Sequence, residues 1–399
     1  MPGLPHPGNI RGLWSGQNRV PEDSMSRHFQ SVDPEGLLEY SVVFTDRALN
    51  HMSQLFQDAM RDISRILKVV YQAEAVAIVP GGGSFGMESI ARQFATGKHC
   101  LVIRNGWFSY RWSQIFEMGG IPSRETVLKA RPLSAHAQAP FAPAPIEQVE
   151  EVIARDRPEL VFAPHVETAS GMILPDDYLS RVAAAVHAHG GLFVLDCVAS
   201  GAIWVDMQRL GVDVLVTAPQ KVWSSTPGAA LIMLSARALA QLAETQSSSF
   251  AADLKKWLQI MQAYENGGHA YHATMPTDAL LRLRNSMNDT LACGLEPLRK
   301  AQWELGGQVR AMLASCGYPS VAAPGFEAPG VVVAYTEDAD ISNAKKFAAL
   351  GIQAAAGVPL MCEEGASFRS FRTGLFGLDK LNDVAGTLAR LRSAVEKLR

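Results

Sequence analysis

The stretch Leu192-Phe193-Val194-Leu195-Asp196 is a short apolar run that ends on an acid. A second run, Val212–Val216, leads to Gln220-Lys221, and a third, Ala229–Leu234, follows after Pro227-Gly228. Short apolar runs that are bounded by turn residues are typical of buried strands. We therefore expect an acid and a lysine at the ends of two neighbouring strands.

An acid and a lysine in these positions have a specific chemical use. The amine of Lys221 can condense with an aldehyde, and the carboxylate of Asp196 can pair with a ring nitrogen. These are the two protein groups that a pyridoxal phosphate site needs. The alternative is a buried acid beside a lysine on the surface, and this pair alone does not decide between the two.

The rest of the chain indicates an α/β fold. From residue 75 onward, strands alternate with helical stretches, which favours a mainly parallel sheet that is covered on both faces. The spacing of apolar residues predicts a long amphipathic helix over Leu49–Val69. Strands are expected at Ala75–Val79, Cys100–Ile103, Leu160–Ala163, Leu192–Leu195 and Val212–Val216, and helices at Met87–Phe94, Ile146–Ala154 and Tyr178–Ala188.

Three segments are expected along the chain. Residues 1–27 are rich in proline and glycine and predict an N-terminal arm. Residues 28–293 form the large domain with the sheet. Residues 294–399 form a smaller α/β domain, in which Val331–Tyr335, Ser342–Leu350, Phe368–Thr373 and Lys380–Leu398 supply the strands and helices.

Composition excludes several classes of partner. The chain has 399 residues, of which 48% are hydrophobic and 19% charged, with a formal net charge of −3. This charge indicates neither a nucleic acid nor a membrane surface as partner. No apolar run approaches the roughly eighteen residues of a membrane span. The five cysteines are scattered and lack metal-binding spacing, so we expect free thiols, no metal and a cytoplasmic protein.

The glycine-rich segment Val79–Ser89 follows a predicted strand and opens a predicted helix. Its amides would converge at a helix N-terminus, which favours an anion such as a phosphate. The segment lacks the Gly-Lys-Ser/Thr ending of a Walker loop and the acidic partner of a dinucleotide site. The alternative is a connection that only turns the chain, and a nicotinamide dehydrogenase would leave Asp196 and Lys221 without a role.

Two further motifs follow predicted strands. Asn105–Arg111 carries several aromatic residues, and His165–Gly171 reads His-Val-Glu-Thr-Ala-Ser-Gly. Open α/β sheets bind ligands at the carboxyl ends of their strands. We therefore expect these motifs to meet the glycine-rich segment at one edge of the sheet.

The order of these motifs resembles the class V aminotransferases of the alanine–glyoxylate and serine–pyruvate type. The resemblance runs from about Leu49 to the C-terminus. It implies the fold type I architecture of aspartate aminotransferase, with a large, mainly parallel sheet of seven strands. It also implies a pyridoxal 5'-phosphate-dependent transaminase that moves an amino group from a small amino acid to glyoxylate or pyruvate by a ping-pong mechanism.

The resemblance implies a role for each matching residue. Lys221 would hold the cofactor as an internal aldimine, and Asp196 would pair with its pyridinium nitrogen. Phe108 would stack on the cofactor ring, and Thr168 would hydrogen-bond its phenolic oxygen. The phosphate would be held by the amides of Gly83, Ser84 and Phe85 and by the side chain of Gln220.

The resemblance also implies a homodimer with shared active sites. The segment Tyr271-His272-Ala273-Thr274 matches a motif through which the partner subunit completes the phosphate cup, with Tyr271 and Thr274 as ligands. Arg372 matches the arginine that binds the substrate carboxylate, because its planar fork suits a carboxylate. Arg369, which lies on the opposite face of the same strand, is expected to be structural.

Two departures leave the substrate and the reaction class open. The segment Gly36–Arg47 replaces a Gly-Pro-Gly-Pro stretch in relatives, so Tyr40, Thr45 and Arg47 could face the substrate. A lyase of the cysteine desulfurase or kynureninase type is the main alternative, with Cys362 as its thiol nucleophile. A desulfurase would stack a histidine where this chain has Phe108. A binding protein without catalysis is a further alternative.

Overall fold

The computed structural model describes residues 32–398. The arm predicted over residues 1–27 lies outside the described residues. Within the described range, no helix is long and apolar enough to cross a membrane. The same range contains no cluster of three or more histidine, cysteine, aspartate or glutamate side chains that could hold a metal ion.

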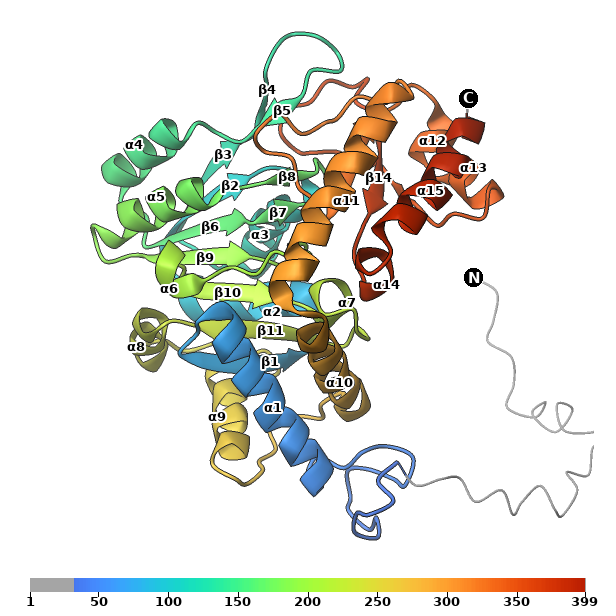
Figure 1. Ribbon diagram of the computed structural model, residues 1–399. Coiled ribbons are helices and arrows are strands. Elements are labelled where there is room, and N and C mark those ends of the chain that lie inside the picture. Colours follow the sequence, from blue (N-terminus) through green and yellow to red (C-terminus); the bar gives the residue numbers. More distant parts are fainter. Residues whose placement is uncertain (1–31, 399) are drawn as a thin grey trace, which may run out of the picture.

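A seven-stranded sheet forms the centre of the large domain (Figure 1). Its spatial order is β1 (Ala75–Pro80), β11 (Ala229–Leu234), β10 (Val214–Thr217), β9 (Leu192–Asp196), β6 (Leu160–Pro164), β2 (His99–Arg104) and β3 (Arg124–Lys129). Only β11 runs against its two neighbours, and the remaining pairs from β10 to β3 are parallel. The predicted α/β fold with a mainly parallel sheet is confirmed.

The central strands are buried at every position, as continuous apolar runs predict. Because successive side chains point to opposite faces, full burial of β9, β10 and β11 means that both faces of the sheet are covered. The edge strand β3 was not predicted. Its sequence, Arg-Glu-Thr-Val-Leu-Lys, is largely polar and partly exposed, so it lacks the apolar run that marks the others.

Helices connect the strands and cover the sheet. They are α1 (Gln54–Tyr71), α2 (Gly83–Ile90), α3 (Trp107–Gly119), α4 (Ile146–Asp156), α5 (Asp176–His187), α6 (Met207–Leu210), α7 (Pro219–Val222), α8 (Ala236–Glu244), α9 (Leu254–Glu265) and α10 (Thr277–Cys293). A π-helical turn, η3 (Ala91–Ala95), extends α2. Two short ladders pair β4 (Arg131–Pro132) with β5 (Phe141–Ala142) and β7 (Val166–Glu167) with β8 (Met172–Ile173).

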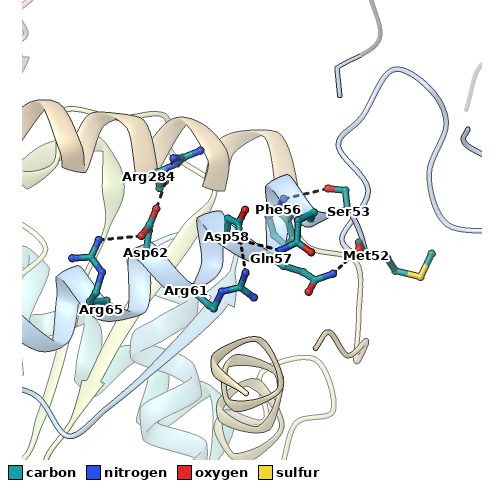
Figure 2. Close-up of polar contacts among 10 residues, drawn as sticks. Met52, Ser53, Phe56, Gln57, Asp58, Arg61, Asp62, Arg65 and Arg284 are labelled. Atoms are coloured by element: carbon teal, nitrogen blue, oxygen red, sulfur yellow. Dashed lines mark hydrogen bonds and ion pairs between the residues drawn. The ribbon is translucent and has the colours of Figure 1, made fainter. Parts of the chain in front are cut away.

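Helix α1 begins at Gln54 instead of Leu49, because Ser53 caps it. The Ser53 hydroxyl accepts a hydrogen bond of 3.2 Å from the amide of Phe56 (Figure 2). Figure 2 also shows Asp62 between Arg65 of the same helix and Arg284 of α10, at 3.0 and 3.7 Å. Such exposed ion pairs contribute little, so the buried apolar face of the helix accounts for its docking.

The C-terminal part forms a smaller α/β unit beyond the long helix α11 (Leu295–Ser315) (Figure 1). An antiparallel sheet orders β12 (Val331–Tyr335), β14 (Ser370–Gly374) and β13 (Ala355–Ala356). Its other elements are α12 (Ala339–Ser342), α13 (Lys345–Ala349), α14 (Leu378–Leu381), α15 (Val384–Val395) and the 3-10 turn η4 (Glu396–Leu398). This unit has an apolar core of its own. The buried residues of that core lie between Leu298 and Leu398, apart from Ala202, which comes from the large domain. A domain boundary at Gly294 stays a prediction that this separate core supports.

Candidate active site

A pocket opens at the edge of the sheet where the parallel strands end. Asp196 is the last residue of β9, and α7 follows β10, its neighbour in the sheet. The strands β1, β2 and β6 lead at this same edge into α2, α3 and β7. The pocket is lined by Gly83, Ser84, Met87, Phe108, Arg111, Val166, Thr168, Asp196, Val198, Ala199, Gln220 and Lys221. The expected convergence of motifs at one edge is therefore found.

The carboxylate of Asp196 is buried. Its Oδ1 accepts a 2.9 Å hydrogen bond from the amide of Val198, and no other partner of this side chain is found within residues 32–398. Burial raises the pKa of Asp196 to about 6, although the Val198 amide and nearby Lys221 oppose the shift. A buried carboxylate with one oxygen free of protein partners is suited to receive a cationic donor.

Lys221 lies in the one-turn helix α7, which directly follows the strand β10. Burial lowers the pKa of Lys221, while the charge of Asp196 acts in the opposite direction. Its Nζ lies 5.8 Å from the centre of the ring of Phe376, a residue of the segment after β14. A lowered pKa increases the fraction of free amine, and the free amine is the nucleophilic form.

The N-terminus of α2 faces the pocket through Gly83 and Ser84. Gly82 precedes the helix without a side-chain cap. The amide of Phe85 donates to Gly82 O at 2.9 Å, whereas no partner is found among the described residues for the amides of Gly83 and Ser84. Two free amides at a helix N-terminus favour an anion. A methyl group on Gly83 would lie 2.7 Å from Val198, so glycine permits this close approach.

Phe108 and Arg111 line the pocket from the first turns of α3. Residues three apart are neighbours on a helix surface, and the Arg111 guanidinium carbon lies 5.2 Å from the centre of the Phe108 ring. Arg111 Nη1 also donates a 2.9 Å hydrogen bond to the hydroxyl of Ser84. Arg111 therefore brings a positive charge to the N-terminus of α2.

Thr168 and Gln220 both line the pocket, although their burial differs. Thr168 follows β7 and is 7% exposed, whereas Gln220 is exposed in α7. Glu167, which precedes Thr168, is fully buried and hydrogen-bonds to the start of α3.

Arg372 on β14 lies beside the pocket, over the ring of the lining residue Phe108. Its Cζ lies 5.4 Å from the Phe108 ring centre, and its Nε donates to Ala356 O at 2.7 Å. Burial lowers the pKa of Arg372, and the nearby charge of Glu167 opposes this. Arg369 instead donates to Glu337 O at 2.6 Å, away from the residues that line the pocket. This placement fits the structural role expected for Arg369.

Tyr271 and Thr274 do not line the pocket of their own chain. The Tyr271 hydroxyl lies 3.0 Å from the hydroxyl of Thr274, and the Tyr271 side chain is 52% exposed. Their predicted role in a partner's site stays a prediction.

Cys362 is buried and 4% exposed. Burial raises its pKa to about 12, and its Sγ lies 3.4 Å from Arg104 O. A protonated, buried thiol is a poor nucleophile. This environment offers no support for the lyase alternative.

Several pocket residues were not assigned roles from the sequence. Arg111 belongs to the predicted segment Asn105–Arg111, but its role depends on helix α3, which places it one turn after Phe108 and which the sequence analysis does not predict. Val198 lines the pocket from a loop, and Phe376 lies near Lys221 from another loop; no periodic pattern marks such positions. Glu167 was seen only as part of a motif.

The family and fold can now be compared with known proteins. The model of the family "Aminotransferase class-V" matches residues 38–355, so the chain belongs to the class V aminotransferases. It has the fold of the fold type I enzymes and is a pyridoxal phosphate-dependent aminotransferase. The resemblance found in the sequence is confirmed.

Individual relatives fall into two groups of enzymes. The chain is 28% identical to 2-aminoethylphosphonate–pyruvate transaminase 2 of Paraburkholderia xenovorans, over 84% of this chain and 86% of the relative. It is 27% identical to the alanine–glyoxylate aminotransferase of Rattus norvegicus, over 63% of this chain and 58% of the relative. Among solved structures, an alanine–glyoxylate aminotransferase from Nostoc sp. matches with a TM-score of 0.75 and 22% identity, covering 88% and 89% of the two chains.

The residues of the pocket fit the cofactor that this family implies. Pyridoxal 5'-phosphate carries an aldehyde, a ring nitrogen that can be protonated and a phosphate. The pocket offers an amine with a lowered pKa at Lys221, a buried acceptor at Asp196 and uncapped amides at the start of α2.

Proposed function

We propose that this chain transfers the amino group of a small amino acid, of the alanine or serine type, to pyruvate or glyoxylate. One observation carries the proposal: Asp196 and Lys221 meet in a single pocket with an uncapped helix N-terminus. The names of its relatives, which include pyruvate and glyoxylate as acceptors, support these acceptors for the present chain.

Lys221 would carry out the covalent and proton-transfer steps. Its Nζ would bind the cofactor aldehyde and, once released by the substrate, would move a proton at the substrate α-carbon. The cofactor supplies an electron sink for the pair left on that carbon. The lowered pKa of Lys221 supports this role, because the amine must be free to accept a proton.

Asp196, Phe108 and Thr168 would hold the cofactor ring. Asp196 would accept a charge-assisted hydrogen bond from the ring nitrogen, which would keep that nitrogen protonated. Phe108 would pack against the ring, and Thr168 would donate to its phenolic oxygen. All three side chains line the pocket.

The phosphate would lie at the start of α2. We infer that the amides of Gly83 and Ser84 and the side chain of Gln220 are its ligands, with Phe85 N available only through a shared hydrogen bond. Arg111 joins this set, because it already contacts the Ser84 hydroxyl. A guanidinium adds the positive charge that a phosphate dianion needs.

Arg372 would bind the carboxylate of the substrate. Its guanidinium lies over Phe108, and its Nε is held by Ala356 O, which leaves the outer nitrogens free for a bidentate contact.

We also propose that the protein is a homodimer in which Tyr271 and Thr274 complete the partner's phosphate site. Two observations support this assembly. Tyr271 is half exposed and lies outside its own pocket. Large apolar side chains are exposed in the loop before α1, namely Leu37, Leu38, Tyr40 and Val42.

A cytoplasmic location is proposed as well, and the five unpaired cysteines support it.

The first experiment tests the cofactor and the attachment site. The purified protein should be yellow, and borohydride should fix the visible band covalently on the peptide that contains Lys221. Lys221→Arg should bind the cofactor without covalent attachment. A wild-type protein that takes up no pyridoxal phosphate on reconstitution would refute the proposal.

A second experiment identifies the amino donor. Alanine, serine and 2-aminoethylphosphonate are added singly to the cofactor-loaded protein, and loss of the visible band marks the half-reaction. Pyruvate or glyoxylate should then restore the band. A panel in which only 2-aminoethylphosphonate reacts would contradict the proposed amino-acid donor while leaving transamination intact.

A further inference from the structure

The carboxylate of Glu167 is fully buried, with an exposed fraction of 0%. It accepts four hydrogen bonds: from Phe108 N at 3.2 Å, Ser109 N at 2.8 Å, Ser109 Oγ at 2.7 Å and Ala169 N at 2.9 Å. No lysine, arginine or histidine forms an ion pair with it anywhere in residues 32–398. A buried carboxylate held only by neutral donors needs those donors in place.

These hydrogen bonds make Glu167 the cap of helix α3. Phe108 and Ser109 belong to the first turn of the helix, and the preceding Gly106 offers no side chain as a cap. A carboxylate at a helix N-terminus satisfies free amides and interacts favourably with the helix dipole. The added methyl group of an alanine at 106 would lie 2.7 Å from the Glu167 side chain, so glycine makes this contact possible. The position of Phe108 is therefore tied to Glu167.

Glu167 lies next to the pocket that holds Lys221, because its neighbour Thr168 and its hydrogen-bond partner Phe108 both line that pocket. Its charge therefore acts on the pocket. Four charged groups act on Lys221: Asp196 and Glu167 raise its pKa, and Arg111 and Arg372 lower it. Burial, the largest effect, lowers the pKa as well. The charge of Glu167 also raises the pKa of Arg372. A single buried anion thus favours the cationic state of two pocket residues.

We propose that Glu167 is a positioning residue whose carboxylate holds Phe108 against the cofactor ring and stabilises positive charge on the Lys221 nitrogen. This inference rests on the proposed function, because it assigns Phe108 and Lys221 to a cofactor site. It does not depend on which amino acid is the donor. Glu167 itself need not touch substrate or cofactor.

The variant Glu167→Gln tests both parts of the proposal. It keeps the shape of the side chain and removes its charge. It also replaces one acceptor oxygen with an NH2 group, which cannot accept a hydrogen bond from the amides and the hydroxyl that surround it. The pH midpoint of the visible cofactor band should fall by about one unit, because a cation loses a nearby anion. The dissociation constant for pyridoxal phosphate should rise about tenfold, and the induced circular dichroism of the band should change because Phe108 moves.

Glu364→Gln is the matched control. Glu364 also caps backbone amides, those of Leu360, Met361 and Cys362, but it is not among the charges that act on Lys221. This control should keep the wild-type midpoint and the wild-type circular dichroism. If Glu167→Gln matches Glu364→Gln in both measurements, the proposal is wrong.

Two further variants keep the test decisive if Glu167→Gln does not fold. Ser109→Ala removes the hydroxyl that bonds Glu167 and the backbone of Asn105 and Gly106 but leaves the Glu167 charge, so the circular dichroism should change while the midpoint stays. Glu167→Asp keeps the charge on a shorter side chain and should also hold the midpoint. A midpoint that falls in Glu167→Asp as well would refute the charge role. Wild-type protein without a cofactor band would instead refute the proposed function.

Discussion

At the residue scale, burial acts in opposite directions on the two central groups of the pocket. It raises the pKa of Asp196 to about 6 and lowers that of Lys221, so each group is shifted toward its neutral form. Each group thereby becomes suited to a charged partner that the protein itself does not supply. This property makes the pocket receptive to a cationic ring nitrogen and an aldehyde.

The raised pKa of Asp196 predicts a pH dependence of stability for the cofactor-free chain. Between pH 3.8 and about 6 the folded state binds more protons than the unfolded state, so the free energy of unfolding falls as pH rises through this window. Relative to Asp196→Asn, the wild type should lose about 2 kcal/mol of its free energy of unfolding between pH 4 and 7. Urea unfolding of both proteins at several pH values measures this difference. Parallel pH profiles for the two proteins would contradict the prediction.

The contacts of Arg372 predict a defect in substrate binding. Arg372→Ala should raise the KM for the amino acid about a hundredfold, because a charge-assisted bidentate contact is lost. Arg372→Lys should recover only part of this, since an ammonium lacks the planar fork. Steady-state kinetics with several donors measures the effect. Arg369→Ala serves as the control, because Arg369 bonds to Glu337 O; an equal KM defect in both variants would count against the assignment.

At the scale of elements, the contact between α2 and the loop after β9 shapes the phosphate end of the pocket. Gly83→Ala would place a methyl group 2.7 Å from the Val198 side chain. Because valine is β-branched, Val198 has few rotamers that would move its methyl groups away. The affinity for pyridoxal phosphate should therefore fall about tenfold. The double variant Gly83→Ala/Val198→Ala should regain most of that affinity, as measured by fluorescence titration.

Gly82→Ala provides the control within the same glycine run, because an added methyl group at Gly82 meets no atom within 4 Å. It should bind the cofactor as the wild type does. If the double variant binds no better than Gly83→Ala alone, the steric explanation is wrong.

The elements also show what a sequence can reveal. The apolar runs that end at Asp196 and before Lys221 predicted β9 and β10 and their shared edge, because burial on both faces leaves a continuous apolar signal. Strand β3 was missed because an edge strand needs fewer apolar residues. Val198 and Phe376 were missed because loops bring them to the pocket, and loop positions follow tertiary contacts instead of a period. Glu167 caps helix α3 through Ser109, which lies 58 residues earlier in the chain, and no local sequence pattern indicates such a contact.

At the scale of the whole molecule, the loop before α1 exposes apolar side chains that the rest of the described chain does not cover. The loop of residues 32–48 projects beyond the start of α1 (Figure 1). Its apolar side chains are exposed to an unusual degree, with 99% for Leu37 and 102% for Val42. Exposed apolar residues that lie together mark interaction sites. In the homodimer proposed above, we expect the second copy to cover this loop and to bring Tyr271 to a site.

The proposed shared site predicts complementation between two inactive variants. One carries Lys221→Ala, and the other carries Tyr271→Phe with Thr274→Val. In a mixed dimer, one of the two sites would combine an intact Lys221 with an intact Tyr271 from the partner. Random mixing should thus restore about a quarter of the wild-type activity, since half of the dimers are mixed and each has one intact site. Co-expression followed by activity and cofactor assays measures this recovery. Lys221→Ala mixed with Arg372→Ala is the control and should gain no activity beyond that of Arg372→Ala itself, because Arg372 lies over Phe108 of its own chain. Recovery in the control, or none in the test pair, would show that the sites are not shared in this way.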